Sequence, residues 1–89
     1  MKVCDSVVST DGFLKVTLDA FNPDRGNGNI KIEELSDKVG RFFVNVNFRS
    51  GERDTVDYRP GDVSRSGALF GISTTTRNDA ISSIVLTPA

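Results

Sequence analysis

Histidine and tryptophan are absent from this chain, which contains only one cysteine and one tyrosine. Without histidine, neither a Ser-His-Asp triad nor a Cys-His pair can form within the chain. One cysteine without histidine also cannot supply the ligands of a usual zinc site. These absences argue against an enzyme and against a structural zinc domain.

Long apolar runs and clusters of basic residues are also missing. No stretch approaches the roughly 20 apolar residues that span a bilayer, and the N-terminal residues lack the apolar core of a signal peptide. The eleven Lys and Arg are spread along the chain, and the formal net charge is −1. A nucleic-acid binder would concentrate positive charge on one face. We therefore expect a cytoplasmic protein with neither a membrane nor a nucleic acid as its partner.

Cys4 cannot form a disulfide within the chain, because no second cysteine is present. It lies in residues 1–11, a mixed segment that we expect to form a peripheral arm. We expect a free thiol there, and the alternative is an intermolecular disulfide between two copies of Cys4. The expected oligomeric state is a monomer, or a weak homodimer formed through Cys4.

Short segments of alternating apolar and polar residues recur along the rest of the chain. The clearest is 42–48, where Phe42, Val44, Val46 and Phe48 fall on one face of a strand. Weaker strand patterns cover 13–18, 29–33, 54–58 and 81–86, and the segment 68–72 is ambiguous. Turn-forming residues separate the segments, most densely at 22–28, and only residues 33–39 are compatible with a helix. The pattern predicts one all-β domain, an antiparallel β-sandwich or barrel.

Residues 78–83 carry the most informative chemistry. Asn78 and Asp79 are adjacent, and two serines follow after two intervening residues. Amide, carboxylate and hydroxyl oxygens are ligands that Ca²⁺ prefers, and a tight loop adds backbone carbonyls. The segment therefore predicts a calcium site formed by Asn78, Asp79, Ala80 and Ser82.

Residues 78–85 resemble the end of a Greek key of the βγ-crystallin family, where such a hexapeptide leads into an apolar strand. Phe43, Phe48 and Gly51 resemble the family's spaced aromatic pair and glycine, although the family's glycine position is occupied by Ser50. The resemblance is to microbial, spherulin-like single domains and is clearest over residues 43–86. It implies a small β-sandwich of two Greek keys, about 12–42 and 43–89, in a non-enzymatic structural or stress protein.

The same resemblance implies a partner calcium loop at residues 36–41. Asp37 is the one ligand position preserved there, since Ser36 takes the first place and Gly40 and Arg41 replace the hydroxyl residues. The charge of Arg41 would oppose a cation. The combined interpretation is one weak calcium site at residues 78–83, with Asp37 as the remaining ligand of the partner loop.

Two other interpretations remain open. Residues 26–35 resemble the later part of an EF-hand loop, but Pro23 and Arg25 occupy its first ligand positions and its flanks are β-like, so a β-hairpin loop is the better interpretation. The chain also fits a carbohydrate- or protein-binding β-sandwich that holds no metal. One Tyr and no Trp disfavour the stacking of sugars in such a module.

Overall fold

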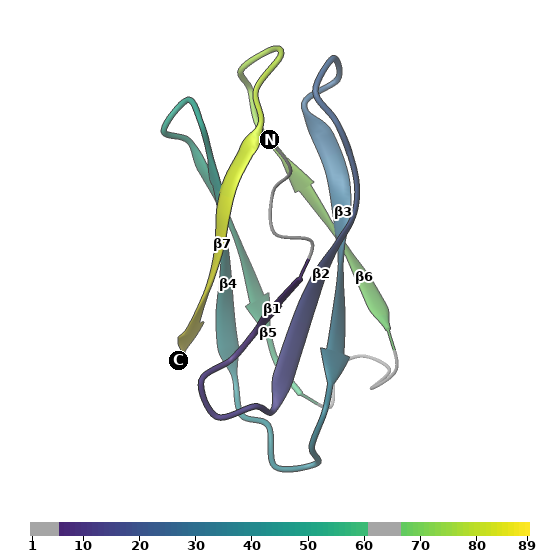
Figure 1. Ribbon diagram of the computed structural model, residues 1–89, viewed down its shortest axis with the longest axis vertical. Helices are drawn as coiled ribbons and strands as arrows, with labels where there is room; N and C mark the ends of the chain where they lie inside the picture. The colour runs from purple at the N-terminus through teal and green to yellow at the C-terminus, as the bar shows by residue number, and fades with distance from the viewer. Residues whose placement is uncertain (1–5, 61–66) are drawn as a thin grey trace.

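The computed structural model describes residues 6–60 and 67–89, which form seven strands in two antiparallel sheets (Figure 1). The strands are β1 (Ser6–Val8), β2 (Leu14–Asn22), β3 (Asn27–Glu34), β4 (Phe42–Phe48), β5 (Arg53–Tyr58), β6 (Ala68–Ser73) and β7 (Ile81–Pro88). The larger sheet has the order β1-β2-β3-β6 and the smaller sheet β5-β4-β7. No described residue is helical. Residues 33–39, the one segment compatible with a helix, begin in β3 and continue into a loop. The prediction of an all-β antiparallel fold is confirmed.

β4 is the central strand of the smaller sheet and has the burial pattern that its sequence predicts. Phe42, Val44, Val46 and Phe48 are each no more than 3% exposed, and the residues between them are half-buried. β4 pairs with β5 on one side and with β7 on the other. Its fully buried face makes it the centre of the sandwich core, because every second side chain is removed from water.

The core lies between the two sheets. The fully buried aliphatic side chains of the larger sheet are Leu14, Val16, Ile30 and Ile32. Complete burial of a side chain of this kind contributes roughly 1.5–3 kcal/mol to stability. Aromatic pairs complete the core: the Phe21 ring lies 5.6 Å from that of Phe48, and Tyr58 meets Phe70 edge-on at 5.9 Å.

β1 lies within residues 1–11, the segment expected to be a peripheral arm. It pairs with β2, with Val7 opposite Val16, and the Val7 side chain packs against the core. A strand of three residues is too short to show periodicity, which explains why the sequence pattern does not predict it. Cys4 and its expected role lie outside the described residues.

The β2–β3 hairpin is tighter than its turn-forming residues suggest. Asn22 pairs with Asn27, so only residues 23–26 form the turn. Gly26 closes the turn with a left-handed φ of 70°, and its N–H donates to Asn22 O at 2.8 Å. Glycine adopts this conformation without the steric penalty of a Cβ.

The chain crosses between the sheets in its second half. β4 and β5 form a hairpin in the smaller sheet, β6 joins β3 in the larger sheet, and β7 returns to pair with β4. β6 also approaches β5 at the edge of the sandwich, where Ser73 N donates to Asp54 Oδ2 at 2.8 Å. The division into sheets does not follow the expected boundary between the two keys near residue 42, because β6 completes the sheet of β1–β3.

Three connections meet at one end of the sandwich, at the top of Figure 1, which we call the loop end. They are the β2–β3 turn (23–26), the β4–β5 turn (49–52) and the β6–β7 loop (74–80). The β3–β4 connection (35–41) lies at the opposite end.

Gly28 lies inside β3, beside a bulge of β2, and there the two backbones pass very close together. A Cβ on Gly28 would lie 2.1 Å from the carbonyl oxygen of Ala20. We expect Gly28→Ala to lower the free energy of unfolding by about 2–4 kcal/mol, because the backbone must shift to make room. Urea denaturation measures this change.

Gly71→Ala is the matched control, because a Cβ on Gly71 would meet no atom within 4 Å. It should be neutral or slightly stabilising, since glycine weakens the interior of a strand. Equal destabilisation by the two substitutions would contradict the close approach at Gly28.

Candidate functional site

Asn78 gives the β6–β7 loop a sharp change of direction. Its φ of 56° lies in the left-handed region, which asparagine tolerates better than most residues. Its N–H donates to Pro23 O at 3.1 Å and ties the loop to the β2–β3 turn. Its side chain is exposed. Asn78 therefore shapes the loop through its backbone.

Asp79 follows with only 4% of its surface exposed. Its Oδ1 accepts the backbone N–H groups of Ser50 at 3.0 Å and Ala80 at 2.9 Å. Its Oδ2 accepts the hydroxyls of Ser50 at 2.6 Å and Thr74 at 3.1 Å. Both carboxylate oxygens therefore bind the protein itself, and they join the β4–β5 turn to the β6–β7 loop.

Two opposing effects act on the pKa of Asp79. Burial favours the neutral acid and raises the pKa, whereas the hydrogen bonds from Ser50, Ala80 and Thr74 favour the ionised form. The hydrogen bonds prevail, so the pKa lies below its ordinary value. Asp79 is therefore a charged acceptor at neutral pH.

Glu52 makes a second bridge between the same two connections. Its Oε1 accepts the N–H of Thr75 at 3.0 Å and the Thr75 hydroxyl at 2.9 Å. Its Oε2 accepts the hydroxyl of Thr74 at 2.8 Å and that of Thr76. The bond from Thr76, followed by those from the Thr75 backbone and Thr74, lowers the pKa of Glu52 to about 2. We call the following six residues the carboxylate latch: Ser50, Glu52, Thr74, Thr75, Thr76 and Asp79.

Thr74 connects the two carboxylates. Its hydroxyl oxygen lies 2.8 Å from Glu52 Oε2 and 3.1 Å from Asp79 Oδ2, so one hydroxyl proton serves two acceptors. Its N–H donates to Gly26 O at 2.7 Å. A Cβ on Gly26 would lie 2.6 Å from Thr74 O, so this approach requires glycine. All three connections of the loop end therefore meet at Thr74.

Ala80 and Ser82 are held by β4 and the turn that follows it. The carbonyl of Ala80 accepts the N–H of Arg49 at 2.7 Å, and the Ser82 hydroxyl donates to Asn47 O at 3.2 Å. Both contacts fasten the start of β7. The oxygens predicted as calcium ligands at Asp79, Ala80 and Ser82 all take part in hydrogen bonds within the protein.

Asp37 lies at the other end of the sandwich, exposed in the β3–β4 connection (Figure 1). β3 runs the length of the sandwich between this connection and the loop end. Residues 36–41 and 78–83 therefore do not face one another, and the structure does not bring Asp37 to Asp79. Asp37 therefore does not join Asn78, Asp79, Ala80 and Ser82 in one site in this fold.

Arg41, which the sequence suggested would oppose a cation, has a partner of its own. Its Nε and Nη2 donate to the two carboxylate oxygens of Asp57, each at 2.8 Å, and its guanidinium lies 5.1 Å from the centre of the Phe43 ring. The bond from Arg41 outweighs burial and, with Arg59, lowers the pKa of Asp57 to about 2. This exposed ion pair fixes the start of β4 to the end of β5 and has no contact with the latch.

Residues 27–34 form β3, so the segment that resembles an EF-hand loop is a strand of the larger sheet. Its Glu34 accepts a hydrogen bond from the Tyr58 hydroxyl at 2.5 Å. An EF-hand requires a helix on each side of its loop. The β-hairpin interpretation is confirmed.

Sequence patterns do not identify Ser50, Glu52 or Thr74 as site residues. A glutamate in an exposed turn is usually solvated, and consecutive threonines are common in loops. Their meeting depends on the pairing of β4 with β7, which sets residues 49–52 beside residues 74–80. The one local signal is the run of three threonine hydroxyls shortly before Asp79.

No protein-family model, no curated protein and no solved structure matches the chain. In residues 6–60 and 67–89, no group of three or more His, Cys, Asp or Glu side chains is arranged to hold a metal ion. The latch contributes two carboxylates and four hydroxyls. The same residues include no helix long and apolar enough to cross a membrane.

The hydrogen bonds of Glu52 make the stability of the fold depend on pH. Its pKa falls from an ordinary value of 4.5 to about 2 on folding, so its contribution is complete above the unfolded pKa and is lost as the pH falls through the folded pKa. We expect the denaturation midpoint to fall between pH 4.5 and pH 2, and Glu52→Gln to reduce this dependence. Denaturant unfolding at a series of pH values measures both slopes.

Glu33→Gln is the control, because no described residue donates a hydrogen bond to that carboxylate. It should leave the pH dependence unchanged. If Glu52→Gln and Glu33→Gln give the same slope, the bonds of Glu52 do not stabilise the folded state.

Proposed function

We propose that the chain is a non-enzymatic structural protein of the βγ-crystallin kind, a β-sandwich whose loop end is fastened by the carboxylate latch. The path of β4–β7 carries this proposal. β4 and β5 are neighbours, β6 lies beyond β5 at the sandwich edge, and β7 returns to the far side of β4. In a Greek key the fourth strand returns to lie beside the first, and the return of β7 to β4 supports the proposal. The Asp79 loop enters β7, the place at which the resemblance expects the hexapeptide.

The N-terminal half supports the proposal less directly. β1, β2 and β3 are consecutive neighbours in one sheet, with β6 as the fourth strand. In the described part of residues 12–42, the strands β2 and β3 both belong to the larger sheet, and only Phe42, the first residue of β4, lies in the smaller one. The proposal therefore rests on residues 43–89.

A structural role also agrees with the state of the latch carboxylates. General acid–base catalysis works best with a group whose pKa lies near the working pH. The pKa values of Glu52 and Asp79 are both lowered, and their oxygens are occupied by donors of the protein. Such groups are suited to holding loops together and poorly suited to transferring protons at neutral pH.

Weak calcium binding at the latch is the second part of the proposal. Glu52 Oε2 and Asp79 Oδ2 both lie within 3.1 Å of Thr74 Oγ1, so three oxygens of the kind that Ca²⁺ prefers converge on one point. A cation there would take the place of the Thr74 hydrogen bonds, with the neutral hydroxyl turned so that its oxygen, like the two carboxylates, faces the ion. Because it must compete with the existing bonds, we expect a Kd on the order of 10⁻⁵–10⁻³ M.

Cross-strand NOEs test the chain path of the proposal. We expect contacts between Val44 and Leu86, which pair β4 with β7, and between Ile30 and Phe70, which pair β3 with β6. ¹⁵N- and ¹³C-edited NOESY spectra of the whole chain provide the measurement. Contacts that place β6 beside β4 in one continuous sheet would reject the Greek-key path.

Thermal unfolding tests the calcium part. A Ca²⁺ concentration about 100 times the Kd should stabilise the fold by about 2.7 kcal/mol, or several degrees of Tm. Mg²⁺ should have a smaller effect, because it requires strict octahedral geometry and loses its water reluctantly. The double variant Glu52→Gln/Asp79→Asn should abolish the rise in Tm, and Asp37→Asn should retain it. A Tm that does not respond to Ca²⁺ would reject calcium binding and leave the structural proposal standing.

A further inference from the structure

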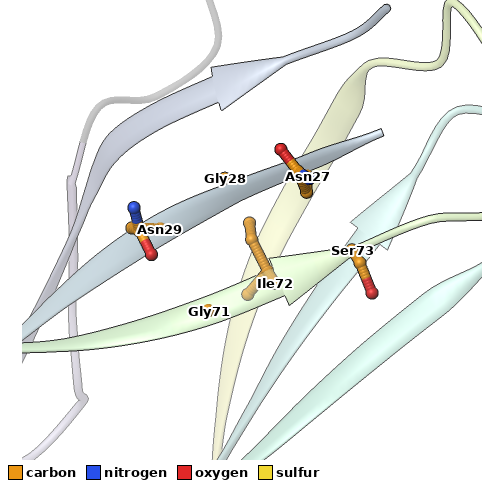
Figure 2. Close-up of a pocket in the computed structure, with 6 residues that line it drawn as sticks. All are labelled: Asn27, Gly28, Asn29, Gly71, Ile72 and Ser73. Atoms are coloured by element: carbon orange, nitrogen blue, oxygen red, sulfur yellow. The ribbon is translucent and has the colours of Figure 1, made fainter. Parts of the chain in front are cut away.

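The outer face of the larger sheet carries a shallow groove between β3 and β6, next to the loop end (Figure 2). Its volume is about 450 Å³, and its lining residues are Asn27, Gly28, Asn29, Gly71, Ile72 and Ser73. The register sets Asn27 opposite Ser73 and Asn29 opposite Gly71. The volume lies within the range of about 300–1,000 Å³ that is usual for small-ligand sites.

The alternation of side chains gives the groove its polar character. Ile30 and Ile72 are buried in the core, so the residues that alternate with them face outward. These are Asn27 and Asn29 on β3, with Ser73 on β6, and all three are exposed. The groove therefore presents two carboxamides and one hydroxyl to solvent.

Gly71 leaves the groove open. A Cβ at this position would meet no atom within 4 Å, so the fold itself does not require glycine there. Gly28 differs, because its neighbour β2 leaves no room for a side chain. A glycine inside a strand weakens it and often marks a place where a ligand comes close to the backbone. Because the fold does not require glycine at position 71, the second explanation, close approach of a ligand, applies to Gly71.

Asparagines on the outer faces of the two sheets are in different states. Asn45 and Asn47 on β4 each donate one hydrogen bond and accept another within the smaller sheet, at 2.9–3.2 Å. The carboxamides of Asn27 and Asn29 have no hydrogen-bond partner among the described residues. Asparagine side chains are thus hydrogen-bonded to protein groups on the smaller sheet, whereas those of the groove can form hydrogen bonds with a ligand.

We propose that this groove binds a neutral carbohydrate chain. Each carboxamide offers a donor and an acceptor side by side, which match a pair of neighbouring sugar hydroxyls, and Ser73 adds a hydroxyl. No charged side chain lines the groove, which gives a charged ligand no partner. The groove follows two extended strands, so an extended chain fits it better than a compact molecule.

The absence of an aromatic ring from the lining sets the strength of binding. Sugar rings usually gain affinity by packing on aromatic faces, and here only hydrogen bonds are available, each of which adds modestly to affinity. We therefore expect a Kd near the millimolar range. This site does not depend on the calcium proposal, because none of its lining residues belongs to the carboxylate latch.

NMR titration of the ¹⁵N-labelled chain tests the site, with maltohexaose, cellohexaose and xylohexaose as probes at up to about 20 mM each. At least one probe should shift the signals of Asn27, Asn29, Gly71 and Ser73, including the side-chain amides. Asn29→Ala should weaken binding about tenfold, the effect of losing one or two hydrogen bonds. Asn45→Ala, the matched control on the opposite face, should leave the Kd unchanged.

Gly71→Thr separates binding from folding. A threonine should suit the strand and keep or raise the Tm, because the position has room and threonine favours β structure. Its side chain should fill the groove and weaken binding at least tenfold. No shifts with any of the three probes, shifts centred elsewhere, or binding unchanged in Gly71→Thr would each overturn the proposal. β6 is the edge strand of the larger sheet, and an extended peptide could pair with its backbone. Shifts confined to the β6 backbone, reproduced by an unrelated extended peptide, would indicate such strand pairing and would also overturn the proposal.

Discussion

The hydrogen bonds of the Asp79 carboxylate determine how the loop end is built. Burial of a charge is strongly unfavourable unless donors compensate it, and here the donors come from Ser50, Thr74 and the backbone of Ala80. They belong to two connections that are far apart in the sequence, so satisfying one charge fixes both. Thr74 extends the constraint to the third connection through the backbone of Gly26. The three loops therefore form one unit.

The latch uses the same atoms that a calcium site would use. Glu52 and Asp79 supply carboxylate oxygens, and the protons of Thr74 and Ser50 neutralise part of their charge in the place of a cation. Under the calcium proposal, hydrogen bonding and metal binding would be alternatives at this end of the molecule, and their balance would decide the affinity for Ca²⁺. The groove beside Gly71 is a separate feature, formed where a strand position has no side chain and where two exposed asparagines have no hydrogen-bond partner in residues 6–60 and 67–89.

Local pattern predicts much of the fold and only part of the site. The alternation of Phe42 to Phe48 identifies β4, because one face of that strand is wholly buried. The three residues of β1 carry no periodicity, and its existence depends on pairing with β2. Asp79 is identified by residue type, but its partners Ser50 and Glu52 depend on strand order, which local pattern does not encode. Strand order also explains why Asp37 lies far from Asp79: β3 carries the chain to the opposite end of the sandwich before residue 37.

Hydrogen exchange at the amides of Ser50 and Ala80 tests the account most directly, because both donate to Asp79 Oδ1. In neutral, metal-free solution containing EDTA, we expect both amides to exchange far more slowly than they would in an unstructured peptide. Protection of both amides under these conditions means that the hydrogen bonds of the carboxylate form without a metal ion. Rapid exchange of both amides in the folded protein, with protection only after Ca²⁺ is added, would contradict the latch.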